Sequence, residues 1–205
     1  MAVFTSYALG ILWATCSNTG EKYLLTNQDP YFANFIQKIN GGKIYTLTHC
    51  RNGTKLYCLR IKKSLESEIE ESGYTGRKNT DRAIPRIDNN ADFVRAYIQC
   101  HSTLGLGPCK TRRGEKIKIP RLRLHGAWTL MEWMSEVIAK TVGVGVKKVQ
   151  KHSNSEMGIL HYQSCMEIIK ICEWVLSESH SQAFETAVYL TFQNKKGPSK
   201  KGQPS

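Results

Sequence analysis

The 205-residue sequence predicts an α/β protein made of two pseudo-symmetric repeats, each with the order helix, two strands, helix, two strands, helix. Two observations lead to this fold class. Two apolar, helix-like segments, residues 7–16 and 93–102, each open a similar succession of patterns. In both successions, segments whose apolar and polar residues alternate as in a strand are followed by segments whose apolar residues recur at helical spacing. We therefore expect each repeat to contain a twisted antiparallel sheet covered by helices.

Small residues mark one face of each opening helix. Gly10 and Ala14 lie four residues apart in the first, and Ala96 and Cys100 lie four apart in the second. Residues at this spacing share a helix face, and small side chains there let two helix backbones come close together. We therefore expect the two helices to pack against each other as a central seam.

The first repeat is expected to continue with a strand, a helix, a hairpin and a closing helix. An Asn-Gly pair, here Asn52-Gly53, is the strongest short-range hairpin signal when it joins alternating segments. Only residues 17–21 separate the opening helix from the next strand, so the leading hairpin should be short. The expected ranges are 22–27 for the strand, 29–39 for the helix, 43–50 and 55–62 for the hairpin, and 65–72 for the closing helix.

The second repeat shows the same order with longer segments. Leu130, Trp133, Met134 and Val137 recur at helical spacing and indicate an amphipathic helix after the first hairpin. The expected ranges are 103–110 and 115–125 for the first hairpin, 128–141 for the helix, 147–153 and 157–163 for the second hairpin, and 165–176 for the last helix.

These ranges divide the chain into four parts. They are a first repeat at residues 1–76, a linker at 77–90, a second repeat at 91–180 and a C-terminal extension at 181–205. The last twelve residues are rich in Lys, Gly, Pro and Ser, which predicts a disordered basic tail. The apolar stretch 187–192 fits either an added edge strand or a segment docked against the last helix.

The opening helices and the element order resemble the LAGLIDADG homing-endonuclease family in its single-chain, two-repeat form. Residues 8–16 and 94–102 occupy the signature positions, and Gly10 and Ala96 take the place of the packing glycine. The resemblance covers residues 5–178. It implies that the twisted sheets face DNA, and that the two seam helices meet at the place where family members hold their metal ions.

The sequence departs from the family at the catalytic positions. Family members cut DNA with a carboxylate at the eighth motif position of each repeat, and here those positions hold Thr15 and His101. Hard cations such as Mg²⁺ need anionic oxygen ligands, and imidazole suits softer metals. The acids nearest in sequence, Glu21 and Asp92, lie beyond the expected helix ends. We expect no catalytic residue and no metal or other cofactor, and Mg²⁺ only if the chain is an endonuclease after all.

His101 leaves two interpretations open. It either caps or hydrogen-bonds the end of a packed helix, which we favour, or acts as a general base on water.

Composition indicates a nucleic-acid partner. The chain has 29 Lys and Arg against 17 Asp and Glu, which gives a net charge of +12, and a phosphate backbone is the natural complement. No segment has the apolar length of a membrane span, and residues 1–14 lack the basic leader and cleavage site of a signal peptide. We expect a cytoplasmic, nucleoid-associated protein that does not bind a membrane.

The basic residues expected to contact DNA cluster on the predicted hairpins and in the linker. The first repeat and the linker contribute Arg51, Lys55, Arg60, Lys62, Arg77, Lys78 and Arg82. The second repeat contributes Lys110, Arg112, Arg113, Lys116, Lys118, Arg121, Arg123, His125, Lys147, Lys148 and Lys151.

A proline interrupts the most basic strand. Before Pro120, the basic residues Lys116 and Lys118 occupy even-numbered positions of the strand. After Pro120, the basic residues occupy odd-numbered positions. Proline is often found at β-bulges, and a bulge at Pro120 would bring all these basic side chains onto one face. Such a ribbon fits the major groove of DNA.

The seven cysteines form no CxxC pair and no metal-ligand spacing, so we expect reduced thiols that mostly fill the core.

Taken together, the residues and the resemblance predict a monomeric, sequence-specific double-stranded DNA-binding protein that does not cleave DNA, with transcription regulation as one use of such binding. Two alternatives remain open: an active homing endonuclease with an unconventional site, and an RNA-binding intron splicing factor.

Overall fold

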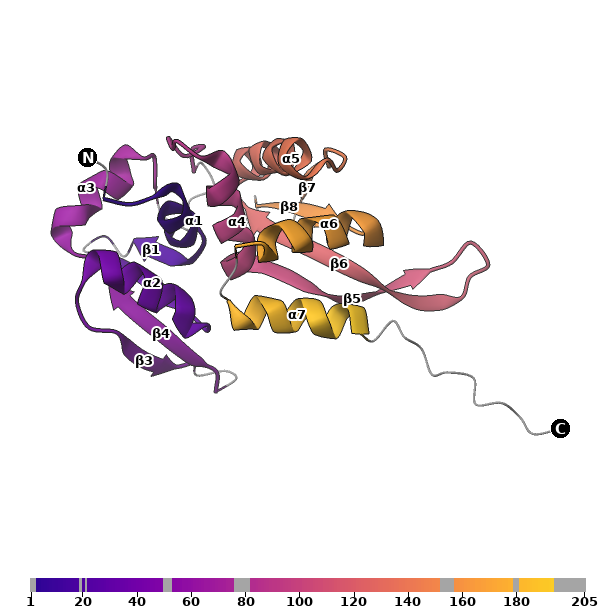
Figure 1. The fold of residues 1–205 in the computed structure, drawn as a ribbon, viewed down its shortest axis with the longest axis horizontal. Coiled ribbons are helices and arrows are strands. Elements are labelled where there is room, and N and C mark those ends of the chain that lie inside the picture. Colours follow the sequence, from indigo (N-terminus) through magenta and orange to yellow (C-terminus); the bar gives the residue numbers. More distant parts are fainter. Residues whose placement is uncertain are drawn as a thin grey trace.

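Two four-stranded antiparallel sheets, one in each half of the chain, form the framework of the computed structural model (Figure 1). The structure describes residues 3–18, 20, 22–49, 53–75, 82–151, 157–178 and 181–193. The first half contains α1 (Ser6–Thr15), β1 (Cys16–Asn18), β2 (Tyr23–Asn27), α2 (Pro30–Asn40), β3 (Tyr45–Thr48), β4 (Lys55–Arg60) and α3 (Lys63–Glu71). The second contains α4 (Asn90–His101), β5 (Ser102–Lys110), β6 (Lys116–Gly126), α5 (Trp128–Val142), β7 (Gln150–Lys151), β8 (Gly158–Tyr162) and α6 (Cys165–Leu176), followed by α7 (Gln182–Gln193).

The predicted fold class is confirmed, because both halves show the same order of elements and the same strand order. The first sheet runs β1-β2-β4-β3 and the second runs β5-β6-β8-β7. The leading hairpin of the first half is short, with three residues in β1 against nine in β5. The two sheets are therefore related by pseudo-symmetry but differ greatly in the length of their leading hairpins.

Local signals in the sequence explain where the main helices begin and end. The Thr5 side chain accepts a hydrogen bond from the Ala8 N–H at the start of α1, and the Asn89 side chain caps α4 in the same way. Helix α5 ends at Gly143 in the left-handed conformation, with φ 71°. In the described part of the chain, no helix has the length and apolarity required to cross a bilayer.

Helices α1 and α4 lie side by side between the two sheets, and Gly10 lies at their contact (Figure 1). A Cβ atom on Gly10 would lie 2.4 Å from the Phe93 carbonyl oxygen and 2.8 Å from the Ala96 Cβ. Both distances are shorter than van der Waals contact, so only glycine allows this approach. The eight residues from Ala8 to Thr15 are all buried, which explains why α1 is apolar on every side.

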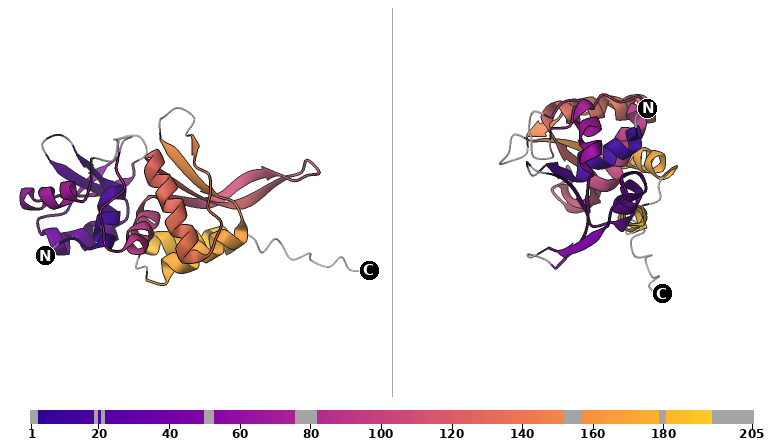
Figure 2. Two further views of the ribbon diagram at one scale, coloured as in Figure 1. Left: turned by 90° about the horizontal axis from the view of Figure 1, so that it is seen from above. Right: turned by 90° about the vertical axis from the view of Figure 1, so that its left-hand side faces the viewer.

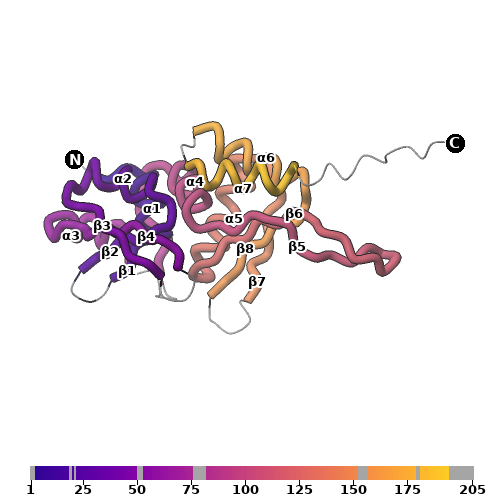
Figure 3. The backbone as a smooth tube through the Cα atoms, turned by 90° about the horizontal axis from the view of Figure 1, so that it is seen from below, coloured from indigo at the N-terminus to yellow at the C-terminus, as the bar shows by residue number. Residues whose placement is uncertain are grey.

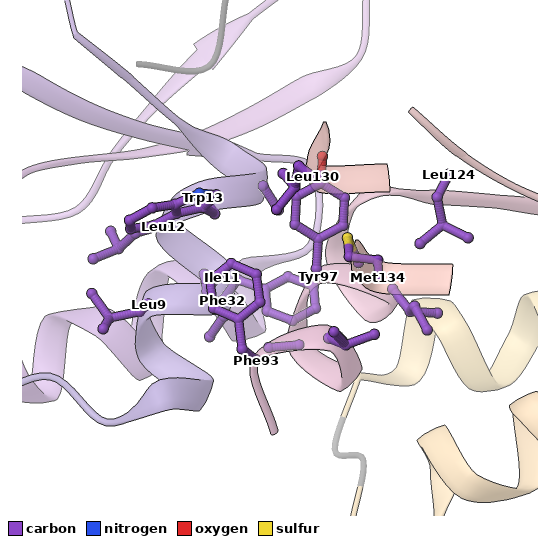
Figure 4. Packing of buried hydrophobic residues seen from close by; sticks show 14 of the residues in the cluster. Leu9, Ile11, Leu12, Trp13, Phe32, Phe93, Tyr97, Leu124, Leu130 and Met134 are labelled. Carbon is purple, nitrogen blue, oxygen red and sulfur yellow. The ribbon is translucent and has the colours of Figure 1, made fainter. Parts of the chain in front are cut away.

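One continuous apolar core joins the two halves across this seam (Figure 4). The Trp13 ring meets the Phe93 ring edge-on across the seam, with centroids 5.6 Å apart. On its other side Trp13 meets the Tyr74 ring at 4.9 Å. Phe93 also contacts Trp133 of α5 at 5.7 Å. Aromatic contacts thus continue from the end of the first half into the helices of the second.

The apolar stretch 187–192 belongs to a helix rather than an edge strand, and the predicted disordered tail at residues 194–205 lies outside the described residues. Helix α7 lies along β5, and Phe184 on it is buried (Figure 3). Phe184, Val188 and Phe192 recur every four residues and face the core, a helical spacing that excludes the edge-strand alternative.

The predicted bulge at Pro120 is wrong. Strands β5 and β6 pair one to one through this region, with Leu106 opposite Pro120 and Gly107 opposite Ile119. Strand β6 pairs with β8 only from Leu122 onward, so Pro120 lies beside an edge where no neighbouring strand needs its missing N–H. Proline is tolerated at such an edge without a bulge.

The unbroken register separates the basic residues of β6 into two sets. Lys116 and Lys118 have the parity of the buried Leu122 and Leu124, whereas the basic residues beyond Pro120 have the opposite parity. The expectation that all of them share one face is therefore also wrong.

We predict that Gly10→Ala lowers the free energy of unfolding by about 1–3 kcal/mol, the usual cost of overpacking a closely packed core. Gly105→Ala is the matched control, because a Cβ on Gly105 meets no atom within 4 Å, and its effect should stay within about 0.5 kcal/mol. Urea unfolding of the two variants measures the difference. Equal stability would show that the seam is looser than described.

Candidate nucleic-acid interface and the base of the helix seam

Helix α1 ends at Thr15 and helix α4 ends at His101, so both motif positions lie at the base of the seam. Thr15 is 3 % exposed, and its hydroxyl donates to the Ile11 carbonyl oxygen at 2.7 Å. Such a bond to the preceding turn is a common way for threonine to satisfy itself inside a helix. Thr15 therefore has neither the charge nor the exposure of a metal ligand.

His101 makes a ring contact within its own helix. It is half-buried, and its imidazole meets the Tyr97 ring edge-on, with centroids 5.5 Å apart. Tyr97 in turn donates its hydroxyl to the His125 carbonyl oxygen at 2.6 Å. These contacts place His101 against the packed end of α4.

The neighbouring motif positions are also occupied by structural contacts. Gln99 accepts a hydrogen bond from the Tyr7 hydroxyl at 2.8 Å, which ties α4 to α1. The Cys100 thiol donates to the Ala96 carbonyl oxygen at 2.9 Å, and burial raises the pKa of this thiol well above its usual value. A neutral thiol and a bound amide offer no anionic oxygen to a hard cation.

A cavity of about 740 Å³ opens beside His101 at the base of the seam. Its wall is shared by the two halves of the chain and by α7. The main contributors are the end of α4 from Gln99 to Ser102, the β2–α2 connection from Asn27 to Asp29, His49, His125, and the α7 residues Ala183, Phe184 and Ala187.

Asp29 is a carboxylate on this cavity that the sequence analysis did not single out. One of its oxygens accepts from the Tyr31 N–H at 2.9 Å and caps α2, and the other accepts from the Ser181 hydroxyl at 2.7 Å. An Asp before Pro30 is a recognisable helix N-cap, but its place beside His101 depends on contacts distant in sequence. Within the described ranges, no group of three His, Cys, Asp or Glu residues is arranged to hold a metal ion.

The second sheet has one face turned away from the core, and this open face is basic. Arg123 pairs with Thr103 on one side and with His161 on the other, while the alternate residues Leu122 and Leu124 are buried. The same parity brings Arg121, Arg123, His125 and His161 onto the open face.

Two features show how closely these groups approach one another. Arg121 lies across β5 and donates to the Pro108 carbonyl oxygen; a Cβ on Gly107 would lie 2.4 Å from its Cδ, so glycine makes room for it. Partial burial lowers the pKa of His161, and the positive charges of Arg123 and Arg121 lower it further. The open face therefore has a positive potential suited to phosphate.

The far part of the β5–β6 hairpin extends beyond the helices that cover the sheet (Figure 2). Its basic side chains are exposed: Lys110, Arg112, Arg113, Lys116 and Lys118. A projecting two-stranded ribbon of this kind has the dimensions that the major groove admits.

The first half has fewer exposed basic residues. Lys55 begins β4 with its Nζ 5.1 Å from the centre of the Tyr57 ring, Arg60 is exposed on the open face opposite Leu24, and Lys62 is exposed just before α3. In the second half, Lys148 and Lys151 are exposed near β7. Arg51, Arg77 and Lys78 lie outside the described residues.

Arg82 is a correction to the predicted DNA contacts, because it is only 3 % exposed. Its Nη1 donates to the Trp13 carbonyl oxygen at 2.7 Å, and its guanidinium lies 4.8 Å from the centre of the Tyr74 ring. The last carbonyls of a helix lack partners within the helix. Arg82 therefore supplies a hydrogen-bond donor to a carbonyl at the end of α1 instead of binding phosphate.

Lys147 also has a partner within the protein. Its Nζ lies 2.7 Å from the Glu167 carboxylate at the start of α6 and 5.8 Å from the centre of the Tyr162 ring. We therefore remove Lys147, together with Arg82, from the set of expected DNA contacts.

The fold and the site together define a two-repeat α/β protein with one basic, outward-facing sheet and with Thr15 and His101 at the two motif positions of its seam. The fold is that of the LAGLIDADG homing endonucleases, and the predicted resemblance is confirmed. The chain superimposes on I-SmaMI bound to uncleavable DNA with a TTCT central four at TM-score 0.59 and 11 % identity, covering 92 % of this chain and 91 % of that one. It matches I-LtrWI bound to target DNA at TM-score 0.58 and 12 % identity, covering 93 % and 90 %.

At 11–12 % identity, the likeness to these structures lies in the fold. No family model matches the sequence, and no curated protein matches it. One of the I-SmaMI structures holds an uncleaved DNA target in the presence of calcium ions, and the chain covers 94 % of it. In this chain the two motif positions hold Thr15 and His101, whose side chains offer no anionic oxygen to a hard divalent cation.

We predict that Arg82→Ala lowers the free energy of unfolding by about 1.5–3 kcal/mol, the value of a hydrogen bond to a charged group. The exposed Arg86→Ala is the control and should change stability by less than about 0.5 kcal/mol. Chemical denaturation compares them. If the Arg82 variant were as stable as the control, Arg82 would be free to serve as a DNA contact.

The cluster of positive charges on the open face leads to a second prediction, which concerns the pKa of His161. Removing a nearby positive charge favours the protonated imidazole, so Arg123→Ala should raise the pKa of His161. Arg113→Ala, at the exposed tip of the hairpin, should leave it unchanged. NMR titration of the imidazole proton measures both. An unchanged pKa in the Arg123 variant would contradict the clustering of these groups.

Proposed function

We propose that this protein binds double-stranded DNA at a specific sequence, as a monomer, and does not cleave it. The fold supports DNA binding, because the solved structures that share it include I-SmaMI and I-LtrWI in complex with DNA. The open face of the second sheet and the exposed tip of its hairpin supply the basic groups that phosphates and base edges need. A single chain with two repeats presents two sheet surfaces without a partner subunit.

The observation that carries the proposal is the composition of the seam base. Phosphodiester hydrolysis by this architecture needs two anionic groups that hold metal ions beside the scissile phosphates. Thr15 is buried and bonded to its own helix, and His101 is packed on Tyr97. These contacts support binding without cutting. Binding without cutting suits a regulator of transcription, and we propose this use within the cytoplasm and nucleoid.

Selection from a random duplex library tests this function directly. We expect enrichment of a motif of roughly 15–25 base pairs, the span of two groove-filling surfaces about one or two helical turns apart. The enriched duplex should remain intact when incubated with the protein and Mg²⁺ or Mn²⁺. Metal-dependent cutting at that site would overturn the absence of cleavage, and lack of any enrichment would overturn specific duplex binding.

One observation favours a second candidate, an active endonuclease. Asp29 lines the same cavity as His101, and a carboxylate there is the nearest described substitute for the missing acids. Both of its oxygens accept hydrogen bonds, however, and a metal ion would have to compete with the Tyr31 N–H and the Ser181 hydroxyl. If the selected duplex is cut, Asp29→Asn separates the possibilities, because only an Asp29-dependent site loses its activity in this variant.

The proposal also predicts how binding responds to salt. Each phosphate contact releases condensed counterions, so the logarithm of the binding constant falls linearly with the logarithm of salt concentration. Arg113→Ala should weaken binding to all duplexes and reduce this slope by about one. Lys147→Ala is the matched control, since Lys147 is paired with Glu167, and it should leave the slope unchanged. Fluorescence anisotropy across a salt series measures both slopes.

A further inference from the structure

The strand registers show that the open faces of the two sheets differ in chemistry. In the first sheet the buried Leu25 pairs with the buried Leu59, which marks the face that packs on the helices. Successive residues of a strand point to opposite faces, so the residues next to Leu25 in β2 and next to Leu59 in β4 lie on the other face of the sheet. Leu24 pairs there with Arg60 of β4.

The open face of the first sheet is mostly apolar. The register of β3 and β4 places Tyr45 opposite Cys58 and Leu47 opposite Leu56 on this face. Tyr45 is 40 % exposed and Leu47 is 48 % exposed, which makes them two of the large apolar side chains that the core leaves uncovered. Arg60 is the only charged residue that the strand pairings place on this face.

The open face of the second sheet is the reverse, with Arg121 and Arg123 in its centre and His125 and His161 beside them. The strand pairings bring no carboxylate onto it. Within the described residues, neither arginine forms an ion pair with Asp or Glu. Arg121 is held across β5 by its bond to the Pro108 carbonyl oxygen, so Arg123 is the better placed to reach a base.

These two surfaces suit different bases. In the major groove, arginine pairs bidentately with the O6 and N7 acceptors of guanine, whereas apolar side chains contact the methyl group of thymine. We propose that the two halves of the DNA target differ accordingly: the second sheet reads guanine through Arg123, and the first sheet reads thymine methyls through Tyr45 and Leu47. This inference rests on the proposed function and specifies which bases the two sheets recognise.

Base analogues on the selected duplex test the inference one group at a time. Deoxyuridine replaces thymine and removes only the methyl group, and 7-deazaguanine replaces guanine and removes only the N7 acceptor. Loss of one buried methyl should weaken binding about fourfold. Loss of the acceptor to arginine should weaken binding by about fivefold to a hundredfold. The deoxyuridine effects should lie in one half of the site and the 7-deazaguanine effects in the other.

Protein variants assign each half to its sheet. Leu47→Ala should remove the sensitivity to deoxyuridine while the sensitivity to 7-deazaguanine remains, and Arg123→Ala should do the opposite. Thr48→Ala is the control for the first sheet, because Thr48 is exposed on the same strand with the opposite parity. All three side chains are at least partly exposed, so the variants should fold, and circular dichroism verifies this.

The outcomes separate the inference from the proposed function. Methyl sensitivity that persists in Leu47→Ala, or guanine and thymine effects mixed within one half-site, would overturn the inference while specific duplex binding stands. Failure to enrich any duplex would overturn the proposed function itself, and the division of the target with it.

Discussion

The close approach of α1 and α4 at Gly10 is the constraint on which the rest of the structure depends. Because the Gly10 backbone packs against the Phe93 carbonyl and the Ala96 methyl group, the two helices hold the sheets on either side close together. Trp13 and Phe93 continue this contact into both halves of the core. The C-terminal ends of α1 and α4 lie together at the base of the seam. The first strand of each sheet, β1 or β5, begins at the residue after its helix. Recognition of DNA by two surfaces at once requires such a rigid centre.

The same centre explains why the fold does not require acids at positions 15 and 101. Thr15 satisfies its hydroxyl within α1, and Gln99 and Cys100 bond to neighbouring groups. Two carboxylates at the base of a packed seam would repel each other unless cations were bound between them. Neutral residues at these positions remove that repulsion. The packed seam is therefore stable without acids at these two positions.

Much of the fold followed from local patterns, and the misses have a shared physical cause. The seam spacing, the Asn-Gly turn and the alternation of the strands lie within short windows, so the element order was predictable. Arg82 reaches the Trp13 carbonyl 69 residues away, and Pro120 avoids a bulge only because β8 does not extend beside it. Asp29 meets Ser181 across 152 residues. Contacts over such separations leave no periodic signal in one sequence.

Specific recognition of duplex DNA is the central claim, and an equilibrium competition tests it most directly. The dissociation constant for the selected duplex is compared with those for a scrambled duplex and a folded RNA at one salt concentration near 0.15 M. The account predicts that the selected duplex binds at least about a thousandfold more tightly than the scrambled one, the lower range for specific DNA-binding proteins. Equal affinity for the two duplexes, or tighter binding to the RNA, would contradict it.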